Sequence, residues 1–194
     1  LDRFINKNGK MIESQRLHDL MTVEVSHFIN THPNSQQSAK TANESLLAGV
    51  PMPWMKRWAG PFPVVAESAQ GGKIRDIDGN EYIDFCLGDT GAMTGHANEA
   101  INSAIIAQAN SGFTTMLPSS DVAWVADHLR NRFGLEKWQF CLSATDANRF
   151  SLRLARQLMG KPKIIVNDWC YHGTVDETLV ILDTQGNTVS RPGA

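Results

Sequence analysis

The chain has 194 residues, of which 42% are hydrophobic and 20% are charged, and its formal net charge is −2. This profile is typical of a globular protein that buries a core, and it excludes intrinsic disorder. The balance of charge gives no indication of a nucleic acid or an anionic membrane as a partner.

Targeting signals and metal patterns are both missing from the sequence. No apolar run approaches the roughly 20 residues of a membrane span, and residues 1–30 lack the order of a signal peptide. The three cysteines, Cys86, Cys141 and Cys170, form neither a CxxC pair nor a metal-binding spacing. We therefore expect no metal, no membrane, and reduced, mostly buried thiols in a cytoplasmic protein.

The first third of the chain predicts two helices and an irregular loop. Apolar residues at helical spacing favour an amphipathic helix over 11–31, which a polar loop over 32–39 and a short helix over 40–48 follow. Residues 50–63, VPMPWMKRWAGPFP, contain four prolines. Proline cannot donate a backbone hydrogen bond, so this stretch is predicted to be an ordered loop without regular structure.

Three short segments rich in β-forming residues come next, at 64–66, 73–76 and 81–85. The turn sequences QGG and DGN separate them, which predicts a small antiparallel meander. Residues 76–80, DIDGN, look like the start of a calcium loop. No glutamate follows at the ligand spacing, so a tight turn is the better interpretation.

A glycine-rich loop and two helices continue the chain. The loop at 88–96, GDTGAMTGH, has neither a GxGxxG pattern nor a P-loop lysine, which argues against a dinucleotide or triphosphate site. Amphipathic patterns predict helices over 97–110 and 120–132, and a Ser-Ser-Asp run caps the second of them.

The next stretch predicts a strand, a helix and a second strand. A short apolar run at 138–142 ends in Ser-Ala-Thr-Asp, which are helix-start residues, and an amphipathic helix continues to Gly160. Residues 163–167, KIIVN, have the composition of a parallel strand buried on both faces. This order predicts a right-handed crossover in an α/β sheet. Residues 174–181 predict a helical turn and a strand, and residues 182–194 carry no visible motif.

Two turns of this unit form a candidate ligand site. The first turn of a helix leaves N–H groups unpaired and positive, and hydroxyls on Ser143 and Thr145 add donors, so a phosphate suits this turn. Taken alone, the same residues are more often an ordinary helix cap. Tyr171 and His172 follow the second strand, at the edge where α/β proteins bind ligands. A phosphate seat beside a flat aromatic ring suits a phosphorylated planar cofactor.

The order Ser-Ala-Thr-Asp-Ala, a helix containing Arg-Leu-Ala-Arg, a strand, and Tyr-His-Gly resembles the class III pyridoxal-phosphate (PLP) aminotransferases. Their glutamate-1-semialdehyde aminomutase branch is most similar, over roughly residues 42–182. The resemblance implies an α/β fold of PLP fold type I and a homodimer. It places a small N-terminal α+β segment with the pocket loop and meander at 1–95, and the start of a large mixed or parallel-sheet domain with flanking helices at 96–194.

The resemblance also implies which residues bind the cofactor PLP. They are Ser143, Ala144, Thr145, Tyr171 and His172. The first three hold the phosphate, Ala144 through its backbone, while Tyr171 stacks on the pyridine ring with His172 beside it. The family pattern has glycine where this chain has Ala144 and glutamate where it has Asp146. The methyl group of Ala144 is acceptable only if its φ is negative.

In the family, the proline-rich and glycine-rich loops line the substrate pocket, which places Met52, Trp54 and Asp89 there. Met55 falls where the aminomutase has a carboxylate-binding arginine, and this argues against glutamate semialdehyde as the substrate unless the loop slips. Trp54 either contacts the substrate or packs as a lid on the core. Asp89 either selects a cationic or hydroxylated substrate or caps a turn, and we favour the cap.

PLP chemistry needs a lysine that holds the cofactor as a Schiff base and an acid against the pyridine nitrogen. In the family both come after the Tyr-His-Gly turn, so we expect no catalytic residue in this chain and a Schiff-base lysine downstream. The sequence thus predicts the N-terminal part of a class III aminotransferase, which moves an amino group from an amine or amino acid to a keto acid or aldehyde. Two alternatives stay open: an aminomutase, and a truncated, non-catalytic relic that binds a phosphorylated ligand or a partner subunit.

Overall fold

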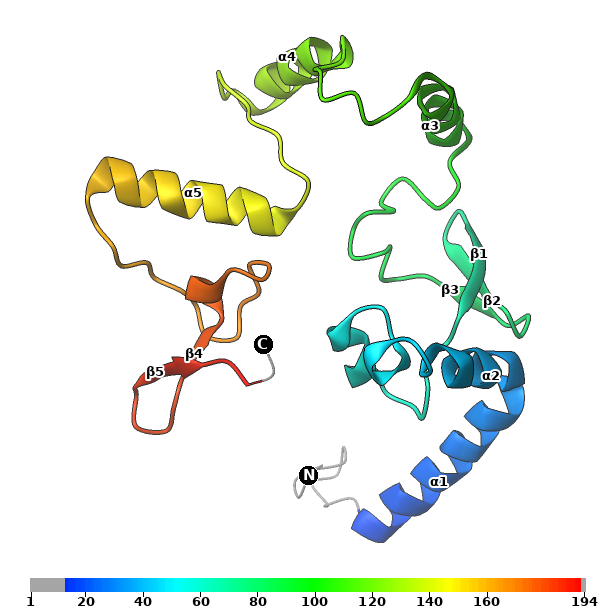
Figure 1. The fold of residues 1–194 in the computed structure, drawn as a ribbon. Helices are drawn as coiled ribbons and strands as arrows, with labels where there is room; N and C mark the ends of the chain where they lie inside the picture. Colours follow the sequence, from blue (N-terminus) through cyan, green and yellow to red (C-terminus); the bar gives the residue numbers. More distant parts are fainter. Residues whose placement is uncertain (1–12, 193–194) are drawn as a thin grey trace. The chain divides into compact units, whose positions relative to one another are not determined.

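The computed structural model describes residues 13–192 (Figure 1). The chain divides into two compact units between Thr114 and Thr115. The domain boundary predicted between residues 95 and 96 stays a prediction. Within the described residues, no helix has the length and apolar character needed to cross a membrane.

Two helices open the first unit: α1, Ser14–Thr31, and α2, Pro33–Ala42. The helix predicted over 11–31 is confirmed from Ser14 onward, and residues 11 and 12 lie outside the described part of the chain. The predicted loop over 32–39 and the helix predicted over 40–48 are wrong, because α2 occupies most of the loop and ends at Ala42.

The start of α2 explains this difference. Pro33 stands at a first helical position, where its missing N–H has no cost. The carboxylate of Asp78 accepts hydrogen bonds from the backbone N–H of Asn34 at 2.6 Å and of Ser35 at 3.0 Å. The cap therefore comes from a residue 44 positions away from Asn34, and no local pattern indicates it.

The loop predicted at the proline-rich stretch is present, but the expected lack of regular structure is wrong at residues 53–57, which form a 3-10 turn. The two 3-10 turns of this region are η1, Leu47–Gly49, just before the stretch, and η2, Pro53–Arg57, within it. The side chain of Val50, between them, is buried. The rings of Trp54 and Trp58 meet edge to face with their centroids 5.2 Å apart.

The predicted antiparallel meander is confirmed as β1, Ala66–Gln70, β2, Lys73–Asp76, and β3, Glu81–Ile83, in the order β1-β2-β3. The first strand begins at Ala66, where the predicted one ends. The tight turn predicted at 76–80 is also present, since the N–H of Asp76 donates to the carbonyl of Asn80 at 3.0 Å.

A polar network built on the buried side chains of Asp76 and His32 joins the two helices to the meander. The hydroxyl of Tyr82 donates to the carboxylate of Asp76 at 2.7 Å and lies 2.7 Å from Nε2 of His32. Asp76 is fully buried and also accepts the backbone N–H groups of Asp78 and Asn80. Because every partner is hydrogen-bonded, the network fixes the end of α1 against β2 and β3.

Two predicted helices are confirmed with bounds shifted by one or two residues: α3, Glu99–Ser111, and α4, Asp121–Phe133. The side chain of Asn98 caps α3 by accepting from the N–H groups of Ala100 and Ile101. Gly134, in the left-handed region with φ of 70°, ends α4.

The predicted helix start at Ser143 is confirmed, since α5 spans Ala144–Met159 and its N-cap is Ser143. The strands predicted at 138–142 and 163–167 are wrong for the described residues, in which neither segment forms a strand. A strand exists only with a hydrogen-bonded neighbour, and here Leu142 and Ile165 are fully exposed instead.

The end of the chain forms a small hairpin. A 3-10 turn, η3, Asp176–Thr178, precedes β4, Val180–Leu182, which confirms the helical turn and strand predicted there. β4 pairs antiparallel with β5, Thr188–Ser190, which the sequence did not predict. Val175 and Thr178 are buried beside the hairpin. The cysteine prediction is partly wrong, because Cys86 and Cys141 are exposed.

Candidate functional site

The N-terminus of α5 is arranged as a capped helix start. The hydroxyl of Ser143 accepts the N–H of Asp146 at 3.2 Å and donates to the carboxylate of Asp146 at 2.9 Å. Its proton is therefore already engaged. The N–H groups of Ala144 and Thr145 lie in the first turn and have no helical carbonyl four residues before them, so they remain the donors that this turn offers to an anion.

Thr145 joins this helix start to the turn after Tyr171. Its hydroxyl oxygen accepts the backbone N–H of Thr174 at 3.1 Å. A hydroxyl that accepts one hydrogen bond keeps its own proton for another acceptor. Thr145 thus holds the turn and can still donate to an anion at the end of α5.

Gly173 lets the two segments approach this closely. Its φ is +80°, and a Cβ on this residue would lie 2.8 Å from Cα of Thr145 and closer still to its Oγ1. Such distances are well inside van der Waals contact, so only glycine fits between the turn and the helix. Gly173 is accordingly buried.

Asn148 forms a second bond between the same segments. Its Nδ2 donates to the backbone carbonyl of His172 at 2.8 Å, across 24 residues of chain. The structure therefore brings together the two groups of residues that the sequence singled out, Ser143 to Thr145 and Tyr171 to His172. Sequence reasoning missed Asn148. The one feature of the sequence that could have indicated it is its position three residues after Thr145, on the same helix face.

The side chain of Tyr171 is 68% exposed, so its ring is open to a partner. The backbone before it is held from another direction by Arg191, whose guanidinium donates to the carbonyl of Cys170 at 3.3 Å. The same guanidinium lies over the ring of Trp169, 5.2 Å from its centroid. Tyr171 is thus an exposed ring on a backbone that is hydrogen-bonded on both sides.

A polar hollow of about 570 Å³ runs along α5. Three arginines and three acidic residues line it together with Phe150, so its charges balance. Arg156 donates to Glu177 at 2.7 Å. Hydrogen bonds from the backbone N–H of Glu177 itself and from Arg156 hold the pKa of Glu177 below its ordinary value. The hollow therefore carries no net charge that selects an anion.

The predicted substrate-pocket residues Met52, Trp54 and Asp89 all lie in the first unit. Met52 and Trp54 are about half exposed, at 45% and 51%, beside and within η2. Whether Trp54 packs as a lid on the core stays a prediction. Contact of these two side chains with a substrate stays a prediction.

Asp89 lies in a left-handed turn of the glycine-rich loop. Four successive residues, 87–90, have positive φ, and three of them are not glycine. Such residues cost of order 1–3 kcal/mol each and concentrate at functional sites. Within the described residues, no hydrogen bond joins the carboxylate of Asp89 to a turn N–H, so the cap that we favoured is not formed there.

The two ends of this loop are anchored by Asp84 and His96. The carboxylate of Asp84 accepts from Nε2 of His96 at 2.6 Å and from the N–H groups of Cys86 and Leu87. The bond from His96, followed by the backbone bonds, lowers the pKa of Asp84 from its ordinary value. His96 also pairs through its backbone with Gly71. His96 thus has a structural role in this loop.

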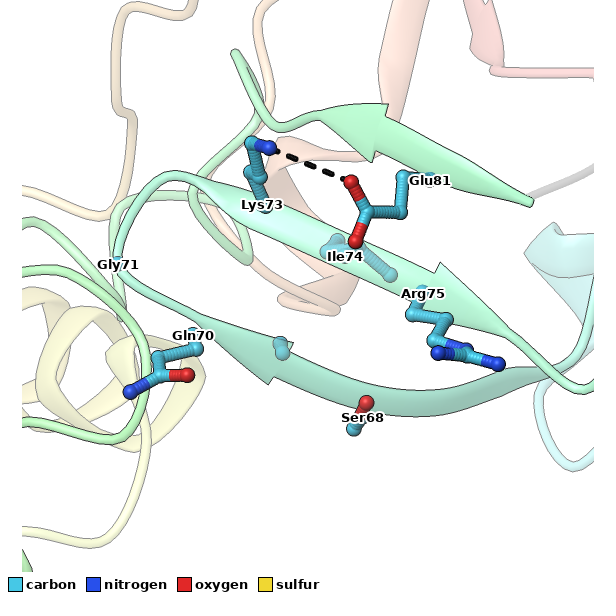
Figure 2. Close-up of a pocket in the computed structure, with 8 residues that line it drawn as sticks. Ser68, Gln70, Gly71, Lys73, Ile74, Arg75 and Glu81 are labelled. Atoms are coloured by element: carbon cyan, nitrogen blue, oxygen red, sulfur yellow. Dashed lines mark hydrogen bonds and ion pairs between the residues drawn. The ribbon is translucent and has the colours of Figure 1, made fainter. Parts of the chain in front are cut away.

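A second hollow, of about 430 Å³, lies on the meander (Figure 2). Figure 2 shows Lys73 of β2 reaching Glu81 of β3, with Nζ and Oε2 3.2 Å apart. Arg75 is paired in the same way with Glu67, at 3.2 Å. None of the predicted site residues lines this hollow, and both of its cations are neutralised.

Comparison with known families identifies the family of the chain. Residues 54–190, more than half of the chain, match the family model described as aminotransferase class-III. The chain belongs to this family. Its fold class, α/β with the architecture of PLP fold type I, follows from the same match and from the solved structures below.

The relatives of this class-III chain include enzymes named glutamate-1-semialdehyde 2,1-aminomutase. The one from Methanosarcina acetivorans is 33% identical over 163 residues, which are 84% of this chain and 38% of that protein. The one from Methanosphaera stadtmanae is 40% identical over 121 residues, 62% of this chain and 29% of that protein. The chain thus spans about a third of the length of these relatives.

Solved structures of class-III enzymes superpose on it closely. A glutamate-1-semialdehyde aminomutase from Pseudomonas aeruginosa PAO1 gives a TM-score of 0.89 at 45% identity, covering 94% of this chain and 40% of that one. A variant of that enzyme was solved in complex with PMP at the same similarity. A transaminase with PLP bound gives 0.75 at 28% identity, covering 84% and 38%.

Proposed function

We propose that this chain forms the phosphate-binding and ring-stacking part of an enzyme that uses PLP to move an amino group. The observation that carries this proposal is the close attachment of the Tyr171 turn to the start of α5, through Thr145 and Gly173. This attachment brings the turn that carries the exposed ring of Tyr171 against the first turn of α5. Matching class-III structures that hold PMP or PLP support it.

The residues fit the phosphate of PLP. The N–H groups of Ala144 and Thr145 and the hydroxyl proton of Thr145 are its donors, and the positive end of α5 favours its charge. Ala144 lies in helical conformation and has no positive φ, so its methyl group is compatible with this role. Ser143 becomes a further donor when its proton turns away from Asp146.

The ring of PLP stacks on Tyr171, with His172 beside it, and bound PLP supplies an electron sink for bonds at the amino-bearing carbon. Met52, Trp54 and Asp89 contact the substrate, and the carboxylate of Asp89 favours a cationic or hydroxylated group. The substrates are an amine or amino acid and a keto acid or aldehyde. The partner chain is a second copy of this protein.

An aminomutase reaction is the second candidate, and the names of the relatives favour it. In that case the amino group moves within one molecule. The distinguishing measurement is turnover with and without an added keto acid. An aminotransferase needs this acceptor in each cycle, whereas an aminomutase turns over without it.

PLP binding by the protein expressed from its own gene tests the proposal. We expect the visible absorption of bound PLP in the wild type. Thr145→Val removes one hydrogen bond to a charged group and weakens binding about tenfold to a hundredfold. Thr145→Ser keeps the hydroxyl and serves as the matched control. A wild-type protein that binds no PLP, or a valine variant that binds as tightly as the serine variant, contradicts the proposal.

A further inference from the structure

We infer that Asn148 is a positioning residue for Tyr171: its side-chain amide fixes the carbonyl of His172 and thereby sets the Tyr171 ring at the start of α5. The inference rests on the proposed function, because it takes Tyr171 as the residue that receives the cofactor ring. In this inference Asn148 acts through the carbonyl of His172.

Two side chains on one helix face hold the turn. Asn148 follows Thr145 by three residues, so both project from the same side of α5. Asn148 donates to the carbonyl of His172 at 2.8 Å, and Thr145 accepts the N–H of Thr174 at 3.1 Å. These bonds hold the residues on either side of Gly173, which leaves the turn little rotational freedom.

The orientation of the Tyr171 ring depends on this backbone. The ring is 68% exposed, so the packing around it does not fix its direction. The carbonyl that Asn148 binds belongs to His172, the residue directly after Tyr171. The bond on the preceding side, from Arg191 to Cys170, is longer at 3.3 Å. Asn148 therefore provides the shorter of the two side-chain bonds that flank Tyr171.

Asparagine has a specific reason to stand at this helical position. It is a weaker helix former than alanine, leucine or glutamate, so propensity does not favour it here. The side chain is only partly exposed, and its amide finds a partner 24 residues away. The interaction with His172 accounts for an amide at this position.

Amide hydrogen exchange in the cofactor-free protein, expressed from its own gene, tests the positioning directly. Asn148→Ala is expected to speed exchange of the Thr174 amide severalfold, because the turn loses one of its two bonds to α5. Ser151→Ala is the matched control, since that hydroxyl is exposed on the same helix and bonds only to the carbonyl of Ala147. Exchange at Thr174 that is the same in Asn148→Ala and the wild type overturns the inference.

PLP affinity then shows whether the effect passes through the ring. We expect Asn148→Ala to weaken PLP binding about fivefold to tenfold, the loss of about one hydrogen bond. In a Tyr171→Ala background the same change is expected to have no further effect. Equal losses in both backgrounds overturn the inference, because Asn148 then acts through the fold. If the wild-type protein binds no PLP, the proposed function is refuted. The hydrogen-exchange result is then the measurement that tests whether Asn148 positions the turn.

Discussion

Gly173 carries the strictest steric requirement in the second unit, and this gives a prediction. Gly173→Ala places a methyl group against Thr145 and forces alanine into a left-handed φ. The left-handed φ alone costs about 1–2 kcal/mol. The overlap adds to it, so we expect the free energy of unfolding to fall by about 3 kcal/mol or more, as measured by chemical denaturation.

Gly186→Ala separates the two costs. Gly186 has nearly the same φ, +83°, but no atom lies within 4 Å of the position that a methyl group would take there. Only the conformational cost of about 1–2 kcal/mol applies to it. If the two alanine variants lose equal stability, the close contact between Gly173 and Thr145 is not present in solution.

Some of the site residues can be recognised from the sequence alone, and others cannot. Ser143 and Thr145 stand where a helix start is evident from residue type alone, and the helix begins there. Asn148 has no such pattern, because an amide inside a helix gains its meaning only from the carbonyl of His172, 24 residues away. The functional roles of Ser143, Thr145 and Tyr171 stay predictions, although the structure places their segments in contact.

At the scale of elements, Ser35 tests how α2 is attached to the meander. Its hydroxyl is fully buried, donates to Asp78 at 2.6 Å and accepts the N–H of Val65 at 3.3 Å. Ser35→Ala leaves the partly buried N–H of Val65 without this acceptor, which we expect to lower the free energy of unfolding by about 1–3 kcal/mol. Ser26→Ala, which removes an exposed hydroxyl of α1, is expected to change little. Thermal unfolding of both variants makes the comparison, and equal effects contradict this attachment.

We expect the stability of the contact between α1 and β3 to fall at alkaline pH. Burial, followed by the hydrogen bond to Asp76, raises the pKa of Tyr82 from 10.0 to about 12. A raised folded-state pKa stabilises the native state fully below pH 10, and this contribution is lost as the pH rises toward 12. The wild type should therefore lose stability across this range more steeply than Tyr82→Phe. Parallel pH profiles of the two proteins would rule the effect out.

Local elements were predictable where the interactions that form them are local. The meander follows from its turn residues, and α5 from its cap and apolar spacing. The strands expected at 138–142 and 163–167 depend on neighbours distant in sequence, and within the described residues they have none. The composition of Lys163 to Asn167 indicates a buried strand, but composition cannot supply the neighbour that a ladder requires.

At the scale of the whole molecule, apolar composition and burial do not match. The sequence is 42% hydrophobic, yet among the described hydrophobic side chains only Val50 and Val175 are buried. Phe85, Leu142 and Ile165 are each at least 91% exposed. Extended apolar surface of this kind marks faces that contact other polypeptide. The overall fold class was predictable because the family motifs lie in these 194 residues. Which polypeptide covers the apolar faces of the helices and loops was not predictable from them.

The cap of α2 by Asp78 has a consequence for biosynthesis. Residue 78 is added to the growing chain after residues 33–42, and α2 is only ten residues long, too short to be stable by itself in water. The carboxylate that caps its first turn is 44 residues further along the chain than Asn34. We therefore expect α2 to become ordered only once Asp78, which follows it in the chain, is in place to cap it.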